Sequence, residues 1–253
     1  MRANHMRRES WRGFQYQLGE CPTCGSNILL TPHSRNWNQV HETISAGEQH
    51  LRELPAQRGI WNIDVTRPAL VLGSRQHETL LNTQRCALDG IDIVRRRSGG
   101  GVVYLAPGEQ VWIDIVIPRG DALWSDDVAQ ASWWLGETWS RALRGLGING
   151  LDVHRDSVRS DAWGELLCFA GVGPGEVVST HTDQRPKLVG ISQRRTRDYA
   201  RFQCTLYMKW NPHHVAHYFA SLPGAVDDVV PRVATIDADA STIVETFVAH
   251  LPR

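Results

Sequence analysis

Three consecutive arginines followed by three glycines form the stretch whose residue types could best do chemistry. Arg95, Arg96 and Arg97 precede Ser98 and the glycines at 99–101. Glycine lets the backbone approach a ligand closely, and successive free N–H groups can form an anion-binding nest. Guanidinium groups beside such a turn suit a carboxylate or a phosphate, because they donate in a bidentate fork. The stretch favours a site for a charged small molecule, although a tight hairpin with solvated arginines would give the same pattern.

The segments around this turn are expected to be strands that position it. Short β-branched or apolar runs predict strands at 60–65, 69–72, 91–94, 102–105, 111–117, 166–169, 176–179, 187–192 and 202–208. Apolar residues spaced by three and four predict a helix over 37–54 and a longest helix that begins at Ser125 and ends near Gly147. Further helices are expected from Asn211 and over 242–251. Asp114 falls inside a buried strand, where an arginine is the expected partner.

Composition limits the class of protein. The chain has 253 residues, 42% hydrophobic and 21% charged, with no net charge and a pI near 7.2. This balance gives no electrostatic footprint for nucleic acid or for an anionic membrane. No segment approaches the ~20 apolar residues of a membrane span, and no signal-peptide pattern is seen, so we expect a cytoplasmic protein. Five scattered cysteines are expected to be reduced thiols.

Residues 1–35 are interpreted as an N-terminal extension, and the domain is expected to cover 36–253. Cys21 and Cys24 form a C-x-x-C pair, but a closed zinc site needs four ligands and no second pair follows. His33 and His41 could complete it in principle. The histidines at 213, 214 and 217 are expected on a solvated helix face, so no metal site is predicted.

Three motifs in order resemble one family. Arg95-Arg96-x-Ser98 followed by three glycines is similar to the signature of lipoate-protein ligases and the related biotin ligases and octanoyltransferases. The strand at 68–72 that ends in Gly73-x-x-Gln76 also matches, as does the segment Lys187-x-x-Gly-x-x-Gln-Arg at 187–194. The resemblance implies one α/β (α+β) domain with a mixed, largely antiparallel sheet and helices mainly on one side.

The same resemblance implies site residues. Lys187 matches the family's single essential lysine, whose ammonium would stabilise negative charge that develops on the acyl carbonyl. The expected acyl- and nucleotide-binding residues are Arg95, Arg96, Ser98, Gly99, Gly100, Gly101, Gly73, Arg75, Gly190 and Ser192. An apolar slot for the acyl tail is expected between the strands at 71–73 and 102–105.

The leading function that this resemblance implies is attachment of lipoate or octanoate to a lysine of a lipoyl domain through an acyl-adenylate. ATP and Mg would be required. The acceptor would be the lipoyl domain of a 2-oxo acid dehydrogenase subunit or the glycine cleavage H protein.

Two alternatives remain open. Cys168-Phe169 followed by Glu176 resembles a stretch of cysteine-dependent octanoyltransferases, whose thiol takes the acyl group from acyl carrier protein. Lys187 could be the cationic neighbour that such a thiolate needs, whereas a buried strand cysteine is the plain reading.

A degenerate acyl-binding protein without catalysis is the second alternative. The family's His-Asp is replaced by the sequence at 105–109, and its His-Gly-Thr by the sequence at 203–205. The large ligases also carry a C-terminal accessory domain, so a separate accessory domain is a further expected partner.

Overall fold

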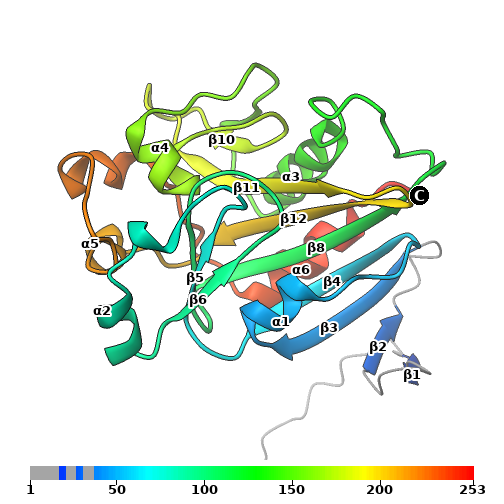
Figure 1. Cartoon of the computed structure of the whole chain (residues 1–253). Coiled ribbons are helices and arrows are strands. Elements are labelled where there is room, and N and C mark those ends of the chain that lie inside the picture. The colour runs from blue at the N-terminus through cyan, green and yellow to red at the C-terminus, as the bar shows by residue number, and fades with distance from the viewer. Residues whose placement is uncertain (1–16, 21–26, 31–36) are drawn as a thin grey trace, which may run out of the picture.

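The computed structural model describes residues 17–20, 27–30 and 37–253 (Figure 1). The first two segments are strands β1 (Gln17–Glu20) and β2 (Asn27–Leu30), which pair in antiparallel fashion. Cys21, Cys24 and His33 lie outside the described residues. The expected domain boundary near residue 36 therefore stays a prediction.

A seven-stranded sheet forms the centre of the molecule. Its strand order is β3 (Asn38–Ile44), β4 (Gly59–Val65), β8 (Gln110–Pro118), β12 (Tyr199–Tyr207), β11 (Lys187–Arg195), β10 (Val177–Ser179) and β9 (Leu151–Val153). Only the pair β3–β4 is parallel. The predicted mixed, largely antiparallel sheet is confirmed.

A second, three-stranded sheet lies against the main sheet. It has the order β6 (Asp92–Arg95), β5 (Ala69–Leu72), β7 (Val103–Leu105), with β5 parallel to β6 and antiparallel to β7. Because β6 and β7 flank β5 instead of pairing with each other, residues 96–102 cross over the end of β5. The alternative of a tight hairpin is therefore wrong, and we call residues 96–102 the glycine crossover.

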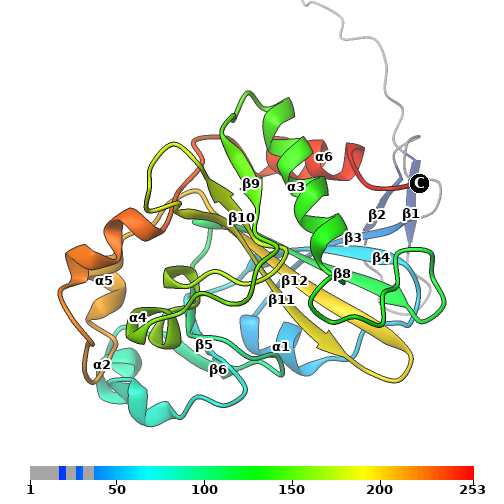
Figure 2. The same cartoon turned by 90° about the horizontal axis from the view of Figure 1, so that it is seen from above.

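The two longest helices cover one face of the main sheet. They are α3 (Trp133–Gly145) and α6 (Ala240–Ala249), and the rings of Trp139 and Phe247 stack between them with centroids 4.1 Å apart. Figure 2 shows α3 and α6 on one side of the main sheet and β5, β6 and α1 (Ala46–Leu51) on the other. The shorter helices are α2 (Thr83–Leu88), α4 (Ala162–Leu166) and α5 (Pro212–Ala216), with 3-10 turns at Glu78–Leu80, Cys168–Ala170, Val226–Asp228 and Val230–Arg232. The hydrophobic core is correspondingly split over the two faces.

The helix predicted over 37–54 is wrong. The chain forms β3, which pairs in parallel with β4, and only then the short helix α1. Ser45 begins this helix with a capping box, in which its hydroxyl accepts from the Glu48 N–H while the Glu48 carboxylate accepts from the Ser45 N–H. Pairing with β4 therefore overrides the helical spacing of the apolar residues.

Two other predicted elements also differ. The longest helix begins at Trp133 and not at Ser125, because the Asp127 carboxylate accepts from the Ala129 and Gln130 N–H groups and forms a separate turn. The strand predicted at 166–169 is wrong, because α4 runs up to Leu166 and a 3-10 turn begins at Cys168. Only Leu167 between them bridges to Val102.

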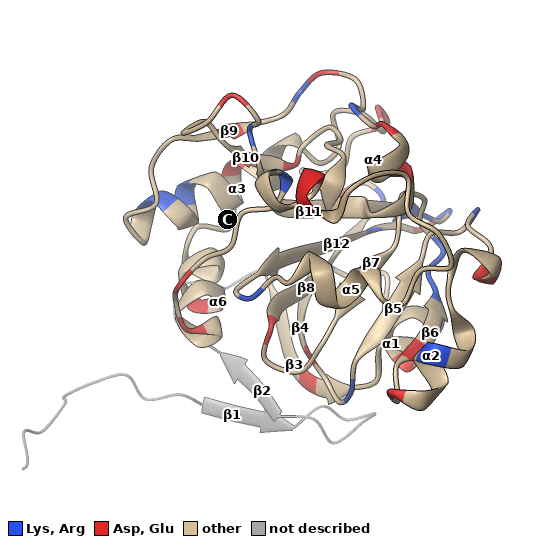
Figure 3. Ribbon diagram, turned by 90° about the vertical axis from the view of Figure 1, so that its left-hand side faces the viewer, with Lys and Arg blue, Asp and Glu red and all other residues tan. Residues whose placement is uncertain are grey.

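The charged residues of the described elements are mixed in sign, as the zero net charge of the chain suggests. Figure 3 shows acidic and basic residues interspersed along the ribbon. Over the described residues, no helix is both long and apolar enough to cross a membrane.

Candidate active site

The glycine crossover lies directly on the end of β5. A side-chain carbon added to Gly73 would lie 1.9 Å from the Gly100 carbonyl oxygen, and Gly100 itself has a φ of +99°. Backbone hydrogen bonds join the two segments, from Ser74 N to Ser98 O at 2.9 Å and from Arg96 N to Leu72 O at 2.9 Å. Glycine at 73 and at 100 therefore lets the two segments meet.

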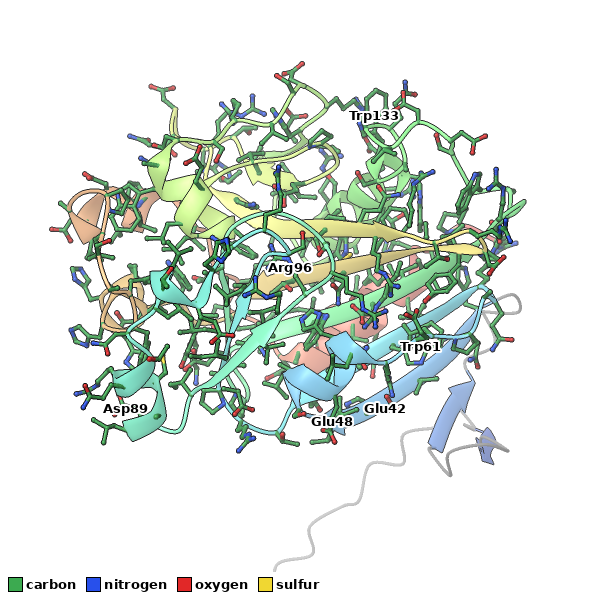
Figure 4. All side chains as sticks on the ribbon, viewed as in Figure 1. Glu42, Glu48, Trp61, Asp89, Arg96 and Trp133 are labelled. Carbon is green, nitrogen blue, oxygen red and sulfur yellow. The ribbon has the colours of Figure 1, made fainter. Side chains whose placement is uncertain are left out.

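Arg96 holds the crossover together from inside. Its side chain is buried, and its Nη2 donates to the Gly99 and Gly101 carbonyls at 2.8 Å each (Figure 4 labels this arginine). Its Nη1 donates to Val71 O at 3.2 Å. The Arg96 guanidinium, which was predicted to bind a ligand, thus donates four hydrogen bonds to three backbone carbonyl groups. Arg96 therefore fixes the conformation of the glycine crossover.

Arg95 and Arg75 lie at the exposed rim of the site. Arg95 donates to the Gln76 carbonyl, and both arginine side chains are exposed. In contrast, Ser98 is buried, and its hydroxyl donates to the Ser192 hydroxyl on β11 at 3.1 Å. The structure thus joins the first and third motifs at the two serines.

Gln76, the last residue of the second motif, binds backbone groups on both sides of the end of β5. Its Oε1 accepts from Gly73 N at 3.0 Å, and its Nε2 donates to Glu165 O at 2.8 Å. The crossover is tied to the same segment, since Val102 N donates to Leu166 O at 2.7 Å. Gly-x-x-Gln therefore fixes the end of β5 to helix α4.

Lys187 and Glu176 form a buried ion pair. Lys187 Nζ donates to Glu176 Oε2 at 2.8 Å and to the Cys168 carbonyl at 2.7 Å, and the lysine is only 1% exposed. The carboxylate also accepts from the N–H groups of Gly173 and Ile191, at 2.6 and 3.0 Å. An ammonium has three donors, and within residues 37–253 the third meets no protein acceptor, although the Phe169 ring lies 5.1 Å away.

The third motif also reaches the rim through Arg194. Its Nη1 and Nη2 donate to the Glu53 carboxylate at 3.1 and 3.0 Å, and Arg97 of the crossover and the Tyr199 hydroxyl donate to the same group. The hydrogen bonds from Arg194 and Tyr199 lower the pKa of Glu53 to about 2. This partly exposed cluster joins the glycine crossover to β11.

A pocket opens between the two sheets. It contains about 400 Å³ of empty space, part of it open to solvent, and its walls are largely apolar. Its lining residues are His50, Val71, Arg96, Val103, Leu105, Trp112, Cys168, Phe169, Gly190, Ile191, Ser192, Gln203 and Thr205. The strands predicted to form a tail slot thus supply three lining residues. Lys187 lies immediately behind the wall formed by Cys168 and Phe169.

A buried polar network lies under the pocket around Asp114. Its carboxylate accepts from Trp112 Nε1 at 2.9 Å, from Gln203 Nε2 at 3.1 Å and from Gln49 Nε2 at 2.6 Å. Arg201, which is also buried, forms an ion pair with Asp114. The expected arginine partner is confirmed.

His50 connects this network to the pocket. Its ring stacks on Trp112 with centroids 5.0 Å apart, and its Nδ1 lies 3.3 Å from Gln203 Nε2. Burial lowers the pKa of His50 to about 3, so the ring is neutral at pH 7. His50, Trp112 and Gln203 line the pocket but were not among the predicted site residues. Strand alternation could have placed Trp112 and Gln203 on the face of Asp114, but no local pattern marks His50.

A family model matches most of the chain. The family model described as the lipoyl protein ligase A/B catalytic domain matches residues 42–245, which contain the crossover, the pocket and the Lys187–Glu176 pair. The chain belongs to this family. The predicted family and the ligase or transferase class are therefore confirmed.

Individual relatives of the family are distant. Lipoate–protein ligase 1 of Staphylococcus aureus strain Mu50 is 27% identical over 118 residues, which are 46% of this chain and 34% of that protein. A bi-partite lipoate protein ligase from Thermoplasma acidophilum, in a structural study with its E2 lipoyl domain, superposes with a TM-score of 0.59 at 14% identity over 83% of this chain and 81% of its own. Lipoate-protein ligase A bound with ATP gives a TM-score of 0.60 at 13% identity over 84% and 81%. These structures confirm the fold, and the match to the S. aureus ligase spans about a third of its length.

Three cysteines and the histidine-rich helix α5 belong to the described residues. Cys86, Cys168 and Cys204 are free thiols, of which only Cys168 is partly exposed. Burial raises the pKa of the Cys204 thiol. Within residues 37–253 no three metal-ligating side chains gather into a site. Helix α5 contains His213 and His214 and has His217 as its C-cap; Asn211 is its N-cap as predicted, with the Asn211 side chain accepting from His214 N.

Proposed function

We propose that this protein attaches a lipoyl or octanoyl group to a lysine of a lipoyl domain through an acyl-adenylate. The observation that carries the proposal is the apolar pocket between the two sheets, which meets the glycine crossover at Arg96 and has the Lys187 ammonium behind its wall. Family membership supports it, as do relatives whose structures contain lipoic acid or ATP.

The pocket walls suit the acyl tail. Burying about six methylenes of an eight-carbon chain is worth about 5 kcal/mol at ~0.8 kcal/mol each. Val71, Val103 and Leu105 supply apolar contacts on one side, and Trp112 and Ile191 on the other. With the tail held in this way, the carboxyl group would face the crossover.

Activation of the carboxyl group would give Lys187 and Glu176 their roles. A carboxylate is a poor electrophile, and adenylation gives it a good leaving group. The Lys187 Nζ lies 2.7 Å from the carbonyl of Cys168, which itself lines the pocket. A shift of the turn at Cys168–Ala170 would let the third N–H of Lys187 reach the acyl carbonyl and stabilise its developing negative charge. Glu176 would keep the ammonium in place.

ATP would lie at the rim of the crossover. The N–H groups at 99–101 and the exposed Arg95 and Arg75 suit its phosphates. Mg would arrive bound to those phosphates, since Mg²⁺ sites commonly combine one or two carboxylates with substrate phosphates. The acceptor would be a lipoyl domain of a 2-oxo acid dehydrogenase subunit or the glycine cleavage H protein, with an accessory domain as a further partner.

The adenylation half-reaction tests the proposal without an acceptor. Purified protein is incubated with lipoate or octanoate and Mg-ATP, and pyrophosphate release and the acyl-AMP mass are measured. We expect both products from the wild type and from Lys209→Met, a control at the other, exposed lysine. Lys187→Met should abolish them. Absence of both products from the folded wild type would contradict adenylation.

One observation favours a second candidate, acyl transfer through Cys168. This thiol lines the pocket, and its Sγ lies 3.7 Å from where a side-chain carbon on Gly100 would stand. The thiolate would attack a carrier thioester and release the carrier thiol, and the acceptor lysine amine would then displace Cys168. However, Lys187 donates to the Cys168 carbonyl and not to its thiol. Loss of activity in Cys168→Ser would separate this candidate from the ligase.

Acyl binding with no turnover from either donor would instead support a non-catalytic binding protein.

A further inference from the structure

The pocket crosses three neighbouring strands of the main sheet. Gly190 and Ser192 of β11 line one end beside Cys168, Gln203 and Thr205 of β12 line the middle, and Trp112 of β8 lines the far end under His50. Neighbouring strands lie ~4.8 Å apart, so the two ends are about 10 Å apart. An acyl chain whose carboxyl group lies near Cys168 would therefore end close to His50 and Trp112.

The hydrogen bonds fix which nitrogen of His50 carries the proton. Gln203 Nε2 donates to Asp114 Oδ1 at 3.1 Å and lies 3.3 Å from His50 Nδ1. The reversed amide would place its carbonyl oxygen against the Asp114 carboxylate, so Nε2 is the correct assignment. An amide nitrogen only donates, and therefore Nδ1 accepts and the ring proton is on Nε2.

This proton has no protein acceptor within residues 37–253. His50 is 7% exposed and lines the pocket, while its Nδ1 is engaged with Gln203 and its face with Trp112. Because His50 lines the pocket, this N–H group is available to a molecule bound there. The network of Trp112, Gln203, Asp114 and Arg201 holds the ring in this orientation. Such an arrangement is expected where a ligand supplies the missing acceptor.

We propose that His50 is a specificity-determining residue that selects acyl tails with a hydrogen-bond acceptor at the far end over plain alkyl tails. The inference rests on the proposed acyl function. A dithiolane sulfur fits this position, because sulfur accepts weakly from the imidazole N–H and makes favourable contacts with an aromatic ring such as Trp112. A terminal hydroxyl would accept the same hydrogen bond more strongly.

The test compares three acids that share one chain length. Binding of lipoic acid, octanoic acid and 8-hydroxyoctanoic acid is measured by calorimetry in the wild type, in His50→Phe and in His217→Phe, an exposed control on the protein surface. Phenylalanine keeps an aromatic ring against Trp112 and removes both the Nε2 N–H and the Nδ1 acceptor, while Gln203 Nε2 retains Asp114 as its acceptor. We expect the wild type and the control to prefer both acceptor-bearing acids about 5- to 10-fold over octanoic acid, which is the size of one hydrogen bond. In His50→Phe the preference should fall to about one, with octanoic acid bound as well as before.

The outcomes separate this inference from the proposed function. Equal binding of all three acids to the wild type, or an unchanged preference in His50→Phe, would overturn the inference alone. Equal weakening of all three acids in His50→Phe would also overturn it, since a merely structural role would do this. If none of the acids bound to the folded wild type, the acyl function itself would fail, and the inference with it.

Discussion

Replacing Glu176 by leucine would leave the Lys187 ammonium buried with no counter-charge. The two side chains are 5% and 1% exposed, and the lysine keeps only the Cys168 carbonyl as an acceptor in this variant. Removing one member of a buried ion pair typically destabilises a protein by about 3–5 kcal/mol. The N–H groups of Gly173 and Ile191 would lose their acceptor as well. We expect the free energy of unfolding to fall within that range.

A double-mutant cycle measures the coupling. Urea unfolding is compared for the wild type, Glu176→Leu, Lys187→Met and the double variant. Because each single variant leaves a buried charge and the double variant leaves none, the double variant should lose less stability than the two single losses added together. Glu137→Leu is a matched control, since Glu137 pairs with Arg155 on the surface and should lose less than about 1 kcal/mol. A loss below about 1 kcal/mol in Glu176→Leu, or simple additivity of the losses, would refute the buried-pair reasoning.

Two further predictions concern the pocket and the crossover. His50 has a pKa of about 3 when folded and near 6.5 when unfolded, so the unfolded chain binds more protons between these values and stability falls as the pH falls. Urea unfolding at pH 7 and pH 5 should show a loss about 2 kcal/mol larger in the wild type than in His50→Phe, and equal losses would contradict the assignment. Gly73→Ala should destabilise the protein by about 1–3 kcal/mol, because its new carbon would meet the Gly100 carbonyl. In a thermal melt the control Gly99→Ala, which has nothing within 4 Å, should stay close to the wild type, and matching melts for both variants would contradict the close approach.

Local signals in the sequence predicted a good part of the fold. The strand at Ala69–Leu72 could be predicted because a short apolar run lies between Pro68 and Gly73. Helix α1 had a readable signal in Ser45-x-x-Glu48, a capping box that should have outweighed the helical spacing of the residues before it. The order β6-β5-β7 had no such signal, because the side on which a strand pairs is a tertiary property.

The site residues also divide into those that a local sequence motif indicates and those that only the tertiary structure brings together. Motif residues such as Lys187 and Ser98 could be singled out by the resemblance of their segments to the family, and the structure brings those segments together. Their burial and partners could not be predicted, because Glu176 is eleven residues from Lys187 and the two meet only through the pairing of β10 with β11. His50 depends on packing against Trp112 from a distant strand.

The intact mass of a lipoyl domain after incubation with this protein tests the central claim most directly. Wild type, Cys168→Ser and Lys187→Met are each supplied with lipoate or octanoate plus Mg-ATP, or with octanoyl-carrier protein without ATP. We predict one added acyl group in the ATP mixture for the wild type and for Cys168→Ser, and none for Lys187→Met. A mass gain only from the carrier, lost in Cys168→Ser, would contradict the ligase and make Cys168 the nucleophile.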